Sequence, residues 1–153
     1  MIKKNLMAFT LMVTFFLLSG CSGNHLAVKK DNSLELCQCF PLPNCVSSDS
    51  MLFYNKVAPF ELAMPEDKAW PIVKEVVSGL PRATIVEERP QYIHAKCRSL
   101  VFRFVDNLEL LLDSDKGVIS VRSSAVIGIT DFGVNYMRVR KLRETLSEKG
   151  VIK

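Results

Sequence analysis

The sequence predicts an α+β domain of two layers, in which a four-stranded antiparallel meander carries two helices on one face (helix–β–β–β–β–helix). Apolar residues recur with a helical period before residue 80 and again after residue 132. Between these segments the period is two, as in half-buried strands. The connections are short, which favours antiparallel pairing of strands that follow each other in the chain.

The first helix is predicted over residues 66–80. Apolar side chains recur there every three or four positions, at Ala69, Ile72, Val73, Val76, Val77 and Leu80. Proline is best tolerated in the first turn of a helix, so Pro71 places the expected start near Asp67 and permits a kink. Gly79 and Pro81 predict the end of this helix.

Four strands and a second helix are predicted after Pro81. The strands are expected at residues 83–88, 91–98, 100–113 and 118–123. Asp106-Asn107 interrupts the long third strand, which predicts a bulge or a sharp bend. The last helix is expected over residues 132–148, with Gly150 beyond its end.

The N-terminal residues have the pattern of a secretory signal peptide, with Lys3 and Lys4, an apolar run over residues 6–18, and small residues before Cys21. The run holds about 13 residues, fewer than the roughly 20 that span a bilayer. Residues 18–21, Leu-Ser-Gly-Cys, resemble the lipobox of bacterial lipoproteins. That resemblance implies cleavage before Cys21 and attachment of palmitate-type acyl chains there, so the expected membrane anchor is a lipid.

The residue after Cys21 is Ser22 rather than an aspartate. By resemblance to enterobacterial-type lipoproteins, this favours the periplasmic face of the outer membrane, if the cell has two membranes. The expected organisation is a cleaved signal peptide over residues 1–20, a lipidated cysteine and flexible tether over residues 21–36, and one α+β domain over residues 37–150.

The charge balance argues against a nucleic-acid partner. The chain has 20 basic and 16 acidic residues, a net charge of +4. Loss of Lys3 and Lys4 with the signal peptide leaves 18 basic residues and a net charge near +2. No basic stripe with interleaved aromatic residues is present. The expected partners are the membrane, through the lipid, and a protein or small anionic ligand.

Four cysteines remain after Cys21: Cys37, Cys39, Cys45 and Cys97. Export places them in an oxidising compartment, where pairing is expected. A Cys39–Cys45 bond is favoured because it closes a short loop, and Cys37 then pairs with Cys97 or stays a thiol. The alternative is a metal site made by Cys37, Cys39 and Cys45, but Cys-x-Cys lacks the wider spacing usual in zinc sites. No metal and no cofactor are expected.

Five short segments are informative when taken in order along the chain. They are residues 43–48 (Pro-Asn-Cys-Val-Ser-Ser), 92–95 (Tyr-Ile-His-Ala), 104–107 (Phe-Val-Asp-Asn), 122–124 (Arg-Ser-Ser) and 131–135 (Asp-Phe-Gly-Val-Asn). Together they resemble the family known as domain of unknown function 1499, over roughly residues 36–146. The resemblance implies a bacterial-type or plastid-type protein without a settled activity, and it supports treating Cys39 and Cys45 as a pair.

The last predicted helix carries a polar stripe. Asp131, Asn135 and Arg138 lie on one face with Leu142, so they are expected to point toward the core. One interpretation is a pocket for an anionic ligand, completed by Arg122 and His94 on the strands. The other is a buried network that docks the helix, in which Asp131 acts as an N-cap and Asp131 or Asp106 pairs with Arg122 or Arg138.

Two functions follow from these residues. The leading hypothesis is a non-enzymatic, lipid-anchored envelope protein that binds a partner or ligand, because no assembled catalytic motif is present. The alternative is an envelope hydrolase in which His94 works with Asp106 or Asp131, and Arg122 or Arg138 holds an anion. Catalysis would require these side chains to meet within hydrogen-bonding distance in an open cleft.

Overall fold

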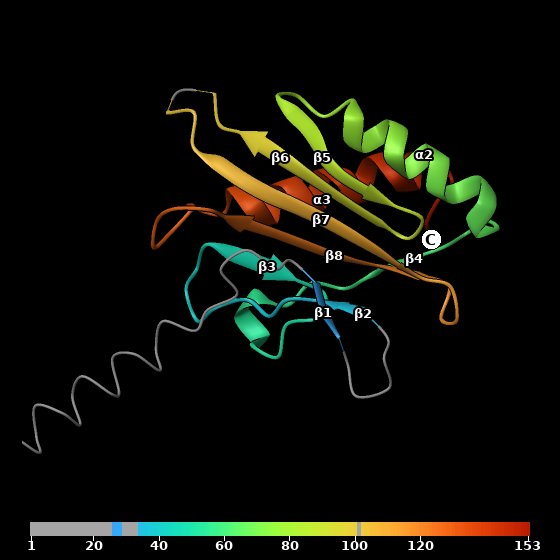
Figure 1. The fold of residues 1–153 in the computed structure, drawn as a ribbon, viewed down its shortest axis with the longest axis horizontal. Coiled ribbons are helices and arrows are strands. Elements are labelled where there is room, and N and C mark those ends of the chain that lie inside the picture. Colours follow the sequence, from blue (N-terminus) through green and yellow to red (C-terminus); the bar gives the residue numbers. More distant parts are fainter. Residues whose placement is uncertain (1–25, 29–33, 101) are drawn as a thin grey trace, which may run out of the picture.

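The computed structural model describes residues 26–28, 34–100 and 102–153. Within them the chain forms a mixed α+β domain, with an antiparallel sheet of six strands and two α-helices (Figure 1). The predicted signal peptide, the lipidation site Cys21 and most of the predicted tether lie outside the described residues. No helix in the described part of the chain is long and apolar enough to cross a membrane.

The large sheet has the strand order β3-β8-β7-β6-β5, and β4 also pairs with β8. Its strands are β3 (Cys45–Ser47), β4 (Phe60–Glu61), β5 (Ala83–Arg89), β6 (Tyr92–Arg98), β7 (Val105–Asp113) and β8 (Val118–Ala125). The predicted sheet of four strands is therefore wrong in its strand number. The two additional strands hold three and two residues, which is too short to show an alternating pattern in the sequence.

The third predicted strand also needs correction. β7 begins at Val105 rather than at residue 100, and the connection from β6 is closed by the bond from the Ser99 amide to the Phe104 carbonyl. The register of β7 with both neighbours runs without a break through Asp106 and Asn107. The irregularity lies in β5 instead, between Ile85 and Glu87.

Both helices, α2 (Glu66–Ser78) and α3 (Val134–Glu148), contribute to a single hydrophobic core with the sheet (Figure 1). Side chains that are fully or almost fully buried include Val73 and Val77 of α2, Leu142 and Leu146 of α3, and Ile93, Leu108, Leu110 and Val121 of the sheet. Each large aliphatic side chain buried this way contributes roughly 1.5–3 kcal/mol. Val151 and Ile152, beyond the predicted end of the domain, complete this core.

The opposite face of the sheet has its own small apolar cluster, formed by Leu36, Tyr92 and Leu111. Leu36 ends β2 (Leu34–Leu36), which pairs with β1 (Leu26–Val28) in a separate two-stranded sheet. Both strands fall in the region predicted as a flexible tether. The described residues of that region form regular structure instead. The short 3₁₀ helix η1 (Phe53–Asn55) follows β3 on this side (Figure 1).

Candidate functional site

The polar stripe of α3 forms a closed network on the helix-covered face, which we call the helix-side cluster: Asp106, Ser123, Asn135 and Arg138. Arg138 Nη2 donates to Asp106 Oδ2 at 2.6 Å, and Arg138 Nη1 donates to Ser123 Oγ at 2.9 Å and to Asn135 Oδ1 at 2.5 Å. Ser123 Oγ donates to Asn135 Oδ1 at 2.6 Å. The four side chains therefore provide hydrogen-bond partners for one another inside the domain.

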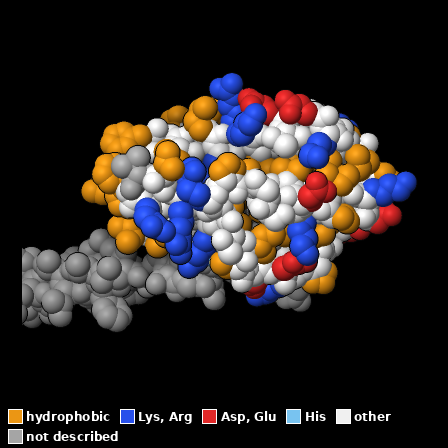
Figure 2. Space-filling model, turned by 90° about the horizontal axis from the view of Figure 1, so that it is seen from above, with side chains coloured by type: hydrophobic (Ala, Val, Ile, Leu, Met, Phe, Trp, Pro, Cys, Tyr) orange, Lys and Arg blue, Asp and Glu red, His pale blue; other side chains and the backbone are white. Residues whose placement is uncertain are grey.

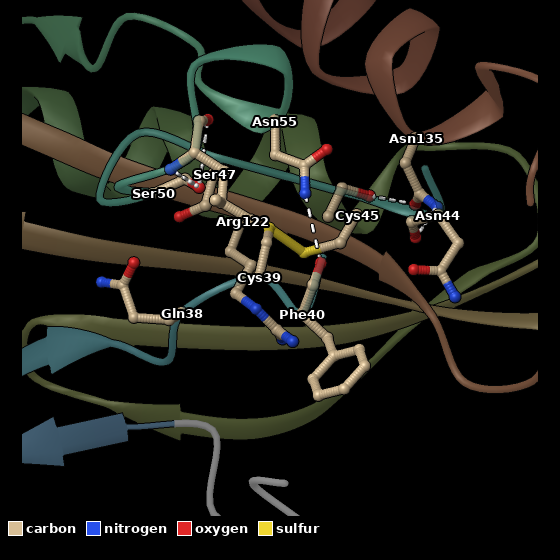
Figure 3. Close-up of a disulfide and its surroundings, with 12 residues drawn as sticks. Gln38, Cys39, Phe40, Asn44, Cys45, Ser47, Ser50, Asn55, Arg122 and Asn135 are labelled. Carbon is tan, nitrogen blue, oxygen red and sulfur yellow. Dashed lines mark hydrogen bonds between the residues drawn. A yellow bond between two sulfur atoms is a disulfide. The ribbon is translucent and has the colours of Figure 1, made fainter. Parts of the chain in front are cut away.

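This network reaches the edge of the sheet through Asn135, which is fully buried. Asn135 Nδ2 donates to the Asn44 carbonyl at 3.1 Å, just before β3 (Figure 3). The Asn44 carbonyl also accepts a bond from the Ala125 amide at the end of β8. The helix-side cluster therefore fixes the start of α3, the end of β8 and the start of β3 to one another.

Asp131 lies next to this cluster but has a different role. Its Oδ1 accepts a bond from the Gly133 amide at 2.9 Å, and its Oδ2 accepts one from the Asn135 amide at 2.7 Å. These are contacts of a capping carboxylate with the unpaired amides at a helix start. The helix itself begins at Val134, two residues later than expected, because Phe132 and Gly133 both have left-handed backbone angles, φ 52° and 80°.

A second polar group lies on the other face of the sheet, and we call it the opposite-face cluster: Tyr92, His94, Asn107, Glu109 and Arg122. Glu109 is fully buried. It accepts a bond from the Tyr92 hydroxyl at 3.1 Å and forms an ion pair with Arg122 Nη1. His94 Nε2 and Asn107 Oδ1 lie 2.9 Å apart. Among the described residues, Arg122 Nε has no hydrogen-bond partner.

The sheet separates the residues that the sequence analysis grouped into one pocket. His94 and Arg122 alternate with core residues of β6 and β8, so they point away from Asp106 and Arg138. His94 therefore does not share a face with Asp106, its suggested acid–base partner. Arg122 likewise pairs with Glu109, and Arg138 takes Asp106 as its partner.

Sequence reasoning missed Glu109 and Tyr92, the centre of the opposite-face cluster. The available signal was a carboxylate inside the apolar run from Leu108 to Leu112, because a charge buried in a strand must find a partner. Burial, and then the charge of Glu109, raise the pKa of the Tyr92 hydroxyl far above its ordinary value. Tyr92 therefore stays protonated and serves as a permanent hydrogen-bond donor.

The four cysteines of the domain take two roles. Cys39 and Cys45 form a disulfide, with Cα atoms 5.7 Å apart, at the end of the sheet near Arg122 (Figure 3). Cys37 and Cys97 are buried and are not bonded to each other. Burial raises the pKa of the Cys97 thiol, which keeps it protonated. No group of three or more His, Cys, Asp or Glu side chains in the described part of the chain could hold a metal ion.

A cavity of about 330 Å³ lies between α3 and the segment before β4. Its lining residues are Lys56, Val57, Ala58, Tyr136, Val139, Arg140 and Arg143. Arg143 donates to the Ala58 and Pro59 carbonyls and lies over the ring of Phe60, and Arg140 pairs with Glu144 at 2.9 Å. Burial lowers the pKa of Arg143. Two of the cations that line the cavity are thus already engaged within the domain.

A group of exposed apolar side chains lies at one end of the sheet. Two loops there, which follow β6 and β8, expose large hydrophobic side chains. We call this set the apolar loop surface: Leu100, Phe102, Phe104, Val126, Ile127, Ile129 and Phe132. Phe132 is 93% exposed, Ile127 80% and Phe102 75%. In Figure 2 this end shows gathered hydrophobic side chains with Lys and Arg side chains beside them.

The two loops are held side by side by backbone bonds. The Val126 amide donates to the Val105 carbonyl at 3.0 Å, where both loops leave the sheet. The segment before β3 holds the second of these loops, because the Asp131 amide donates to the Pro43 carbonyl and Asn44 Nδ2 donates to the Gly128 carbonyl. The rings of Phe102 and Phe104 stack with centroids 5.5 Å apart. The apolar loop surface is therefore one connected feature.

Comparison with known proteins gives one match. The family described as "Protein of unknown function (DUF1499)" matches residues 35–146, which is most of the chain and nearly all of the described domain. No curated protein and no solved structure matches the chain.

Proposed function

Because the chain belongs to the DUF1499 family, a family of unknown function, we propose its role from its own residues: a lipid-anchored protein of the cell envelope whose domain is a non-enzymatic binding module. The observation that carries this proposal is the apolar loop surface. Monomeric soluble domains rarely leave so many large apolar side chains together in water, and such patches usually mark interaction sites.

The state of the polar residues favours binding over catalysis. Asp106 and Arg138 are paired on one face of the sheet, and His94 and Glu109 make contacts on the other. A general base must reach a substrate proton within hydrogen-bonding distance. Side chains held in these buried contacts do not converge on an open cleft, so the hydrolase alternative gains no support from their arrangement.

The anchor in this proposal is Cys21, acylated after removal of residues 1–20. Ser22 supports delivery to the periplasmic face of an outer membrane, where a lipid-held module meets envelope components. Several acyl chains on one residue hold a protein firmly, since each buried methylene contributes about 0.8 kcal/mol.

The test of the anchor uses the full chain produced in a double-membraned bacterium. We expect the wild type to incorporate labelled palmitate and to fractionate with the outer membrane, and Cys21→Ser to lose both properties. Cys37→Ser is the matched control and should keep them, because Cys37 is buried in the domain. Equal labelling of Cys21→Ser and the wild type would contradict the proposal.

The binding role has a separate test. Catalytic turnover by the purified protein that disappears in His94→Ala, with the melting temperature unchanged, would overturn it. His94→Gln serves as a second variant, because its amide can keep a hydrogen bond to Asn107 and so preserve the fold. We expect both variants to act only through stability.

A further inference from the structure

We propose that the apolar loop surface docks on an anionic lipid bilayer and holds the domain against the membrane in one orientation. The occupant is the bilayer itself rather than a second protein. This inference rests on the proposed function, because it takes the acylated Cys21 as the point at which the chain enters the membrane. It adds the surface, the orientation and the lipid chemistry.

The shape of the surface fits a bilayer. The exposed side chains stand on two loops that project beyond the end of the sheet (Figure 1). They include aromatic rings at Phe102, Phe104 and Phe132. Aromatic and aliphatic side chains on the apolar side of an amphipathic surface are those that enter the boundary between headgroups and acyl chains.

The charge around these tips complements anionic headgroups. Exposed basic side chains stand on the same end of the sheet, at Arg82, Lys96, Arg98 and Arg103. The Arg82 side chain reaches across to the Arg98 carbonyl, which places this corner of the sheet next to the loop that follows β6. Basic residues beside a membrane surface are attracted to anionic lipids.

The acidic residues of this end do not oppose such docking. Asp106 is buried in its ion pair with Arg138, and Asp131 caps α3. Exposed acids at the other end of the domain include Asp115 in the β7–β8 turn and Glu66 at the start of α2. Glu75 is exposed in the last turn of α2, on the helix layer rather than on the loops. At that other end exposed bases lie among the acids, because Lys116 pairs with Asp113 and Lys153 with Glu61. The exposed cations beside the apolar loop surface are therefore a local positive cluster that a negative surface can meet.

The length of the chain keeps the domain close to the bilayer, although it does not by itself select one surface. Five residue steps separate Cys21 from Leu26, the first described residue of β1. An extended chain spans at most about 3.6 Å per residue, so Leu26 lies within roughly 18 Å of the acylated residue. A domain held this close must bring one of its surfaces to the headgroups. At such short range even weak contacts are favoured, because the tether raises the effective concentration of the surface.

The experiment uses the full chain, extracted from membranes and reconstituted into vesicles of phosphatidylglycerol and brominated phosphatidylcholine. Brominated acyl chains quench tryptophan fluorescence only at close contact. In Phe132→Trp we expect the new tryptophan to lose most of its fluorescence in these vesicles. The native Trp70, on α2, supplies the baseline, and Val86→Trp on β5 is the matched control for an exposed site away from the loops.

Charge is tested in the same assay. Replacing Arg98 and Arg103 with glutamine should restore much of the fluorescence of Phe132→Trp, as should high salt or vesicles without phosphatidylglycerol. Lys68→Gln, on the first turn of α2, should have no effect. Because all variants are at exposed positions, folding is preserved and can be checked by the melting temperature.

The outcomes separate the two proposals. Protein that does not remain with the vesicles contradicts the lipid anchor. Protein that remains with the vesicles, while the tryptophan introduced by Phe132→Trp is quenched no more than the one introduced by Val86→Trp, overturns the docking inference. If the tryptophan of Phe132→Trp is instead protected from aqueous iodide in a concentration-dependent way, a second copy of the chain covers the surface, and the inference is likewise wrong.

Discussion

Replacement of Arg138 by methionine tests whether the helix-side cluster is a structural network or an open ligand pocket. Methionine keeps the apolar stem of the side chain but removes the charge that Asp106, Ser123 and Asn135 share. The Arg138 side chain is 14% exposed and that of Asp106 is 6% exposed, so solvent screens the pair only weakly. Removing one partner of a buried ion pair costs about 3–5 kcal/mol.

We therefore expect Arg138→Met to lower the free energy of unfolding by about 3–5 kcal/mol, in urea denaturation followed by circular dichroism. A double variant that also carries Asp106→Leu should recover much of this loss, because no buried charge then remains without a partner. The matched control is Arg140→Met on the same helix. Arg140 and Glu144 are 59% and 43% exposed, and such helical pairs contribute only about 0.3–0.5 kcal/mol.

The reasoning is refuted if Arg138→Met costs no more than Arg140→Met, or if the losses of Asp106→Leu and Arg138→Met simply add. Either result would mean that water reaches the cluster and screens its charges. The cluster would then be accessible to an anionic ligand, and the pocket interpretation of the α3 stripe would be the better one.

Three further predictions concern stability. Replacing both Cys39 and Cys45 with alanine should lower the free energy of unfolding by roughly 2 kcal/mol, from the closure entropy of a short loop, whereas chemical reduction should leave that double variant unchanged. The free energy of unfolding should fall as the pH rises above about 9, because the folded domain keeps Cys97 protonated while the unfolded chain releases that proton. The expected loss is about 1.4 kcal/mol per pH unit for each such group. Cys97→Ala should flatten this alkaline loss between about pH 8 and 10, and an unchanged slope would show that the Cys97 pKa is not raised. Gly133→Ala should cost about 1–2 kcal/mol in urea unfolding although the new methyl group meets no atom within 4 Å, because only the left-handed φ of 80° opposes it.

Sequence periodicity predicted the mixed α+β class and the long elements, because each presents one apolar face to a shared core. The 66–80 segment forms α2, and Val73 and Val77 are buried as their spacing indicates. Short strands gave no such signal, since β3 and β4 are recognised only through their partners on β8. The polar pair at 106–107 indicated a bulge, yet both residues continue β7 because other side chains meet them across the sheet.

The candidate site shows a different limit. Helical spacing brought Asn135 and Arg138 together correctly, because both belong to one element. Helical spacing could not show whether His94 and Arg122 lie on the face of the sheet that α3 covers, since that depends on the register of their strands with β7. The exposed loops escaped notice for a related reason: Phe102 and Ile127 look like core residues in the sequence, and only the fold leaves them outside.

Two residues in the loops that carry the apolar loop surface have backbone angles that side chains normally avoid, Arg103 at φ 55° and Phe132 at φ 52°. Such a conformation costs roughly 1–2 kcal/mol, which a glycine at either position would relieve. A stability-guided redesign of this domain would therefore choose glycine at both positions. The same redesign would remove a cation and an aromatic ring from the end of the domain, so the gain in stability would weaken the bilayer docking that we propose.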